Sequence, residues 1–192
     1  MSLHYLQKTG YVQEHRTNAV QLLGLLDAAI GSIADAMQET VGAATRFDEA
    51  YRAVALLCRV ALWANGYRPS ATIEEQQRVL IGSLRHSIGL DSERISRLDA
   101  LRIAVEYSVG RNDARRVREC IDAAGDLLRD VTRWIARYRP DLAAVDSVNG
   151  RPGPDLPFPG PRGRRTPAAS SPASSPRSRR RPGSRNASSA RG

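Results

Sequence analysis

The chain has 192 residues, with 29 lysines and arginines against 20 acids, and it contains two cysteines. Its formal net charge of +9 is carried by residues 151–192, which hold ten arginines and one acid, so residues 1–150 are neutral overall. The first residues lack the basic start and apolar block of a secretory signal, and the apolar stretch around 53–64 is interrupted by Arg59 and too short to cross a bilayer. We therefore expect a cytoplasmic protein with no membrane association.

Two helices are predicted in the first third of the chain, because apolar residues recur at intervals of three and four positions, which places them on one helix face. In the first helix, starting near Thr17, they are Leu23, Leu26, Ile30, Ile33 and Met37. In the second helix they are Phe47, Tyr51, Val54, Cys58 and Ala61. Asn65 and Gly66 follow as a typical helix C-terminus.

Three further helices are predicted before Pro140. Thr72 and Glu75 form a capping-box pattern that opens the third helix, which ends near Gly89. Asp91 is positioned to cap the fourth helix and Asn112 to cap the fifth. The apolar positions of these three helices are Leu80 and Leu84, then Ile95, Leu98, Leu101 and Val105, then Val117, Ile121, Ala124, Leu128, Val131, Ile135 and Tyr138.

These elements predict an all-α fold, an antiparallel bundle of about five helices over residues 1–145. No segment alternates with period two over a useful length, so no strand is expected. Residues 146–192 consist mainly of Pro, Gly, Ser, Ala and Arg with almost no core-forming side chains, so we expect a disordered tail. Its arginines have two open interpretations: salt-sensitive phosphate binding without sequence preference, or a non-functional extension.

Metal and cofactor sites are not expected. Cys58 and Cys120 both fall within amphipathic patterns, which predicts buried, reduced thiols rather than a disulfide. The three histidines, at 4, 15 and 86, have no ligand spacing with cysteine or carboxylate. The sequence also contains no glycine-rich phosphate loop and no nucleophile elbow.

Three segments carry a resemblance to a known family. They are Ala50-Tyr51-Arg52, then Gly66-Tyr67-Arg68-Pro69, then the stretch from Leu98 to Ser108, which contains Asp99, Leu101, Arg102 and Tyr107. In order and spacing they resemble the HEPN domain (higher eukaryote and prokaryote nucleotide-binding), over roughly residues 15–142. This resemblance implies a helical bundle that usually dimerises and is often encoded beside a minimal nucleotidyltransferase.

In many HEPN proteins the helix that corresponds to the fourth one here carries an Arg-x(4–6)-His motif, which serves a metal-independent ribonuclease. The arginine neutralises charge on the scissile phosphate and the histidine moves protons near neutral pH. Arg102 occupies the arginine position, but Tyr107, Ser108 and Val109 stand where the histidine is needed. The same motif occurs nowhere else in the chain. An unperturbed phenol has a pKa of about 10, so Tyr107 is a poor base, and the chain looks like the non-catalytic Arg-x4-Tyr branch of the family.

Several arginines and one tyrosine are candidates for contact with nucleotide or RNA, each with a structural alternative. Arg102 either contacts phosphate or pairs with Asp99 or Glu106 on its own helix. Tyr107 either stacks on or hydrogen-bonds a ligand, or packs at a dimer seam. Arg52 either contacts phosphate or pairs with Asp48 or Glu49.

Arg111 and Arg115 open the fifth helix, where guanidinium groups and helix N-terminal amides can meet a phosphate. The alternative is a solvated charged face, because acids interleave with these arginines.

The favoured hypothesis is a non-catalytic HEPN-like module that binds a nucleotide, RNA or a partner protein. We expect a homodimer with a possible nucleotidyltransferase partner. One alternative is a toxin-like ribonuclease that uses Arg102 with a substitute for the missing histidine. Another is a purely structural protein whose helices bury a partner.

Overall fold

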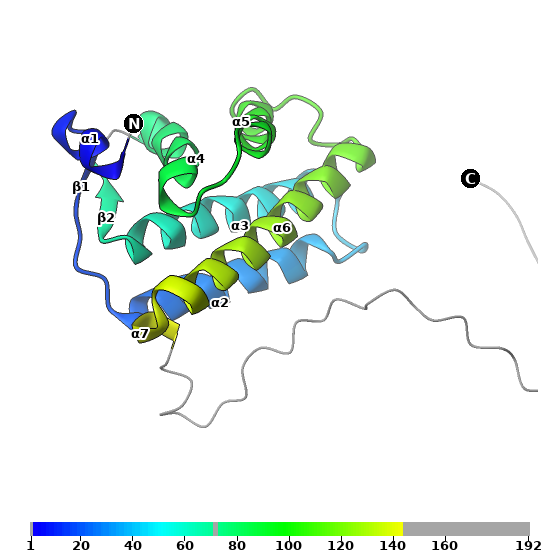
Figure 1. The fold of residues 1–192 in the computed structure, drawn as a ribbon. Coiled ribbons are helices and arrows are strands. Elements are labelled where there is room, and N and C mark those ends of the chain that lie inside the picture. The colour runs from blue at the N-terminus through cyan, green and yellow to red at the C-terminus, as the bar shows by residue number, and fades with distance from the viewer. Residues whose placement is uncertain (1, 71–72, 144–192) are drawn as a thin grey trace, which may run out of the picture. The chain divides into compact units, whose positions relative to one another are not determined.

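The computed structural model describes residues 2–70 and 73–143, with side chains from residue 76 onward in the second range. In chain order the elements are α1 (Leu3–Lys8), β1 (Val12–Glu14), α2 (Ala19–Ala36), α3 (Ala43–Ala64), β2 (Tyr67–Pro69), α4 (Ile73–Ser87), α5 (Ser92–Glu106), α6 (Ala114–Tyr138) and α7 (Pro140–Ala143) (Figure 1). The predicted tail, the boundary at residue 145 and the capping box at Thr72 lie outside the described residues.

The all-α fold predicted from the sequence is confirmed, and the five expected helices correspond to α2–α6. Asp91 caps α5 as predicted, because its carboxylate accepts a hydrogen bond of 2.9 Å from the Arg94 amide. The cap predicted for α6 is wrong by one residue. Asp113 holds that position rather than Asn112, and its carboxylate accepts from the Arg115 amide at 2.8 Å.

Four short elements were not predicted. Strands β1 and β2 pair antiparallel, with Val12 opposite Pro69 and Glu14 opposite Tyr67. Each strand has only three residues, which is too short to produce a period-two pattern. Helices α1 and α7 are also short, with six and four residues. Pro140 opens α7, a position that proline tolerates because its missing amide proton would have no partner there.

Helix α3 lies at the centre of the bundle, and half of its 22 residues are buried. It packs against α2, α4, α5 and α6, as Figure 1 shows for the three long helices α2, α3 and α6. Arg46, near the start of α3, donates to the Ala36 carbonyl at the end of α2, while Thr17 before α2 donates to the Trp63 carbonyl near the end of α3. Helices α2 and α3 are therefore antiparallel.

Helix α6 runs parallel to α3. Their first turns meet where the Cys120 thiol lies 3.9 Å from the Phe47 carbonyl, and their last turns meet where Arg139 donates to the Ala64 carbonyl. The two helices are parallel because α4 and α5 come between α3 and α6 in the sequence. These two helices lead the chain back to the end of the bundle where α3 starts. Phe47, Leu57, Leu62, Leu127 and Val131 are among the fully buried side chains of this core.

One helix in the described part of the chain is long and apolar enough to cross a membrane by length and composition alone. It is α2, with a mean hydropathy of 1.4 over 18 residues and 28% of that window buried. The apolar stretch that the sequence indicates at residues 53–64 belongs to α3 instead. Within the bundle, α2 buries Leu22, Ala29 and Ile33 against its neighbours.

Both cysteines are buried free thiols, as predicted. Burial raises the pKa of Cys58 and of Cys120 to about 12, because the thiolate would lose its hydration. The thiolate is the reactive form, so we expect neither cysteine to react with a disulfide reagent such as DTNB at neutral pH in the native protein. Two thiols should react once guanidinium unfolds the chain, and rapid labelling before unfolding would contradict this prediction.

Candidate functional site

Arg102 is held by two carboxylates of its own helix. Its guanidinium donates to Asp99 at 2.7 Å and to Glu106 at 2.5 Å, and its side chain is only 18% exposed. The hydrogen bond to Asp99 is the main reason that the pKa of Arg102 is raised. The predicted structural alternative is therefore present, and Arg102 offers little free hydrogen-bonding capacity to a ligand.

Tyr107 ends α5 as its C-cap residue, and it is 68% exposed. Ile103, one helical turn earlier, and Val109, just after the helix, are also large apolar side chains left in solvent. Together Ile103, Tyr107 and Val109 form an exposed apolar patch at the C-terminal end of α5. The aromatic ring is thus available for contact, whether with a ligand or with another protein.

Arg52 and Arg111, predicted separately, line the same groove. The groove has a volume of about 540 Å³ and lies between α3, α4, the end of α5 and the loop before α6. Its walls are formed by Asp48, Tyr51, Arg52, Ala55, Leu56, Arg59, Gln77, Val105 and Arg111. It combines an apolar floor with charged and polar side chains around it, which is the composition of a ligand-binding cleft.

Four buried polar atoms in this groove have no hydrogen-bond partner among the described residues. They are Asp48 Oδ1, Tyr51 Oη, Gln77 Oε1 and Arg111 Nε. Buried polar groups are nearly always satisfied in folded proteins, because an unpaired one keeps its desolvation cost without compensation. Four such atoms from three segments of the chain therefore mark a place where a bound molecule or water completes the hydrogen bonding.

The groove carries an excess of positive charge. Arg111 pairs with Asp48 across 63 positions of sequence, and Arg52 approaches Glu49 at 3.8 Å while remaining exposed. Arg59 pairs with no acid in the part of the chain that the structure describes, and it is half-buried against the groove. Among the described side chains, one guanidinium beside the unsatisfied atoms therefore has no acidic partner.

Tyr51 connects the groove to Arg102. Burial raises the pKa of the Tyr51 phenol above its usual value, and the nearby Arg102 charge opposes this only in part. The phenol therefore stays protonated at neutral pH and presents a hydrogen-bond donor to the groove. Arg102 is not among the residues that line the groove, and its charge acts on the Tyr51 phenol.

Arg115 lies away from the groove. Its side chain points into solvent and pairs with Glu119 at 3.0 Å. At the start of α6, where a phosphate was expected, the Arg115 amide donates to the Asp113 carboxylate. Arg116 instead folds over Gly110, where a Cβ would lie 2.7 Å from the arginine side chain and where φ is +70°.

No histidine lines the groove among the described residues. His86 lies beside a different hollow, with Tyr11 and Arg78, and burial lowers its pKa. His15 packs against the Trp63 ring at 4.4 Å. The same residues contain no group of three or more histidines, cysteines and acids that could hold a metal ion.

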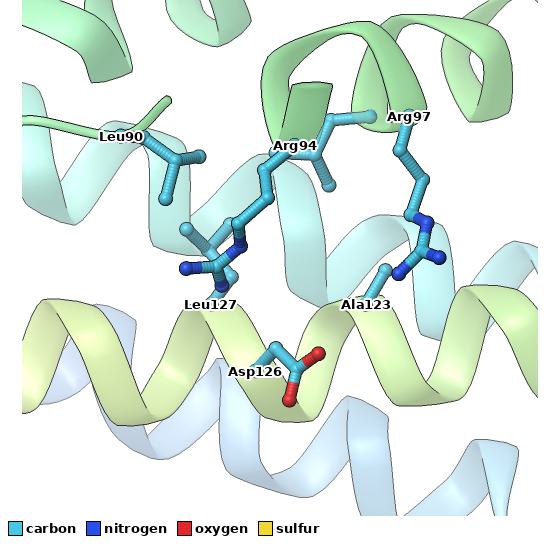
Figure 2. Close-up of a pocket in the computed structure, with 7 residues that line it drawn as sticks. Leu90, Arg94, Arg97, Ala123, Asp126 and Leu127 are labelled. Carbon is cyan, nitrogen blue, oxygen red and sulfur yellow. The ribbon is translucent and has the colours of Figure 1, made fainter. Parts of the chain in front are cut away.

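A second basic cleft, between α5 and α6, is too small for a ligand. Figure 2 shows Arg94 and Arg97 reaching from α5 toward α6, where Asp126 lies below them. The cleft has a volume of about 20 Å³, enough for a single water molecule. We interpret it as a charged part of the packing interface between α5 and α6.

The sequence reading missed Tyr51, Arg59 and Gln77 as lining residues. Arg59 lies two helical turns after Arg52, so both occupy one face of α3, and this spacing was a usable signal. Gln77 belongs to another helix, and nothing in the sequence pairs it with Tyr51. Comparisons of the chain with protein-family models, curated proteins and solved structures found no match, so the HEPN resemblance rests on the sequence segments alone.

Proposed function

We propose that the helical domain is a cytoplasmic, non-catalytic, HEPN-like module that binds a nucleotide or RNA in the groove between α3 and α5. The observation that carries this proposal is the set of four unsatisfied buried atoms beside the free guanidinium of Arg59. A cleft with this composition gains stability from a ligand that supplies both negative charge and hydrogen bonds.

The unsatisfied atoms constrain the ligand chemistry. Tyr51 Oη and Arg111 Nε are donors, so they call for acceptor atoms such as phosphate oxygens. Asp48 Oδ1 and Gln77 Oε1 are acceptors, so a ligand must donate hydrogen bonds to them. Inorganic phosphate has few donors at neutral pH, because only its protonated oxygens can donate. A nucleotide provides both, because its base carries amino or imino donors and its phosphate carries acceptors. The apolar floor of Ala55, Leu56 and Val105 suits the flat face of a base.

The non-catalytic part of the proposal is supported by the surroundings of Arg102. Both carboxylates that hold it belong to α5, and no imidazole from the described residues lines the adjacent groove. Tyr51, the nearest titratable donor, has a raised pKa and is a poor proton acceptor at neutral pH.

Arg59→Ala tests the groove directly. We expect adenosine monophosphate to bind the full chain in isothermal titration calorimetry, and we expect this variant to raise the Kd about tenfold, because a charge-assisted hydrogen bond to phosphate is lost. Adenosine should bind more weakly than its monophosphate. Among the described side chains, none pairs with Arg59, so the substitution breaks no ion pair between them.

The matched control is Arg118→Ala, which removes the same charge from an exposed position on α6 outside the groove. Its Kd should stay within about twofold of the parent chain, because an exposed charge at that distance is largely screened. Equal losses in the two variants would contradict a site at the groove. Cleavage of RNA by the pure protein, abolished by Arg102→Ala, would contradict the non-catalytic part.

Partner binding has separate support in the exposed patch of Ile103, Tyr107 and Val109. Three large apolar side chains in solvent at one helix end are typical of a contact surface. We propose that this patch serves the homodimer, or the nucleotidyltransferase partner, that the family resemblance implies. It lies at the same end of α5 as Val105, which lines the groove.

A further inference from the structure

A second groove lies at the other end of α5, where the turn between α4 and α5 faces the last two turns of α6. It has a volume of about 220 Å³, and it shares no lining residue with the groove between α3 and α5. Its walls include Gly89, Arg94, Arg133, Trp134, Arg137 and Tyr138. None of these residues takes part in the function proposed above.

Two aromatic rings form one side of this groove. Trp134 and Tyr138 are one helical turn apart on α6, with ring centroids separated by 5.5 Å and planes tilted by 39°. Tyr138 is 56% exposed, whereas Val131 and Ile135 of the same helix are buried. Burying this ring would remove apolar surface from water, so the exposed face is available for stacking.

Guanidinium groups surround the rings. The Arg137 guanidinium carbon lies 5.3 Å from the centre of the Tyr138 ring, and this arginine meets no acid in the described part of the chain. Arg94 and Arg133 share the carboxylate of Asp130. Asp91, the remaining acid of the lining, caps the first turn of α5. Three arginines against two acids leave the groove with one net positive charge, which is exposed beside the aromatic rings.

The size and chemistry of the groove favour one class of ligand. A volume of about 220 Å³ is below the range of typical small-molecule pockets, so the groove accommodates a flat ring rather than a whole drug-sized molecule. Aromatic side chains interleaved with arginine are the recurring way in which proteins hold single-stranded nucleic acid, since bases stack on the rings while guanidinium groups meet the backbone phosphates. A protein segment without an acidic side chain would gain less binding free energy, because it could not pair with the guanidinium of Arg137.

We propose that the groove formed by Trp134, Tyr138 and Arg137 stacks a base of single-stranded RNA and holds the adjacent phosphate. This site is independent of the groove between α3 and α5, so either can fail without the other. It gives the helical domain a contact with RNA that does not require the arginines of residues 151–192.

The two tryptophans of the chain allow a local readout. The Trp63→Phe variant leaves Trp134 as the sole tryptophan, and it breaks no hydrogen bond among the described residues because the Trp63 indole nitrogen is unpaired. We expect a short oligouridylate to quench the fluorescence of this variant. In the Trp134→Phe variant the remaining tryptophan is Trp63, which packs against His15. The fluorescence of this variant should not change when the oligouridylate is added.

The second experiment measures the affinity of the full chain for a labelled oligouridylate by fluorescence anisotropy. Tyr138→Ala and Trp134→Ala should each raise the Kd at least about fivefold, because a stacking partner is lost. Trp134→Phe should stay within about twofold, since a phenyl ring still stacks. The matched control is Tyr5→Ala, an exposed tyrosine on α1 outside the groove, which should leave the Kd unchanged.

Three results would overturn the proposal. The first is oligouridylate binding that leaves both the Trp134 fluorescence and the Kd of Tyr138→Ala unchanged, because binding then resides elsewhere. The second is no binding of the oligouridylate at all. The third is a Trp134 signal that depends on protein concentration and not on RNA, which would assign the groove to a protein contact. None of these results bears on the effect of Arg59→Ala on nucleotide binding.

Discussion

Replacing Phe47 with alanine is expected to lower the free energy of unfolding by about 3–5 kcal/mol. Phe47 is among the largest fully buried side chains and lies in the first turns of α3. Its carbonyl lies beside Cys120 of α6, and Arg46 next to it bonds the end of α2, so the ring sits where three helices meet. Alanine leaves a cavity that a close-packed core cannot fill. Urea unfolding followed by circular dichroism measures the change.

The matched control for this prediction is Val20→Ala, which removes apolar atoms from an exposed position of α2. Its effect should remain within about 0.5 kcal/mol, since little buried surface is lost. A loss below about 1 kcal/mol for Phe47→Ala would show that the end of α2 and the starting ends of α3 and α6 do not form the tightly packed centre described here.

Removing the acid of the groove should strengthen nucleotide binding. We expect Asp48→Asn to lower the Kd for adenosine monophosphate about tenfold at low ionic strength, because it removes a negative charge facing the phosphate and releases Arg111 from its ion pair. Asparagine has nearly the same shape and retains one oxygen as an acceptor for a donor on the base. Isothermal titration calorimetry at two salt concentrations measures the gain, which should shrink as salt rises.

Asp126→Asn serves as the charge control. This carboxylate pairs with Arg129 on the surface of α6 and does not line the groove, yet the substitution changes the net charge of the chain equally. Its Kd should stay within about twofold of the parent chain. If Asp48→Asn weakens binding, the negative charge of Asp48 favours the ligand, and the phosphate does not lie near Arg111.

The helices could be predicted because their determinants are local. Apolar spacing along α3 and α6, the Asp91 cap and the Asn65-Gly66 ending act within a few residues, and the structure contains each of them. The error at the α6 cap has the same local origin, since Asn112 and Asp113 are adjacent and both suit the position. The strands could not be predicted, because pairing Val12 with Pro69 depends on two segments meeting after α3 has formed.

The candidate site was predictable only in parts. Arg52 and Arg111 could be chosen one at a time as cations, but their meeting in one groove depends on how α3 packs beside the loop before α6. Of the two partners predicted for Arg52, the structure has Glu49, while Asp48 pairs with Arg111, which reaches this carboxylate from a distant part of the chain. Unsatisfied atoms such as Tyr51 Oη are properties of packing and leave no trace in sequence.

The parallel alignment of α3 and α6 has a consequence for synthesis of the protein. During translation, α2 and α3 can pair as soon as residue 64 has emerged, but the side of α3 that meets α6 has no cover until residues 114–138 follow. The ribosome-bound chain therefore exposes an apolar helix face until α6 is complete, about seventy residues of elongation after α3, or several seconds at ordinary rates. Over that interval a chaperone that covers this face of α3 would protect the nascent chain from aggregation.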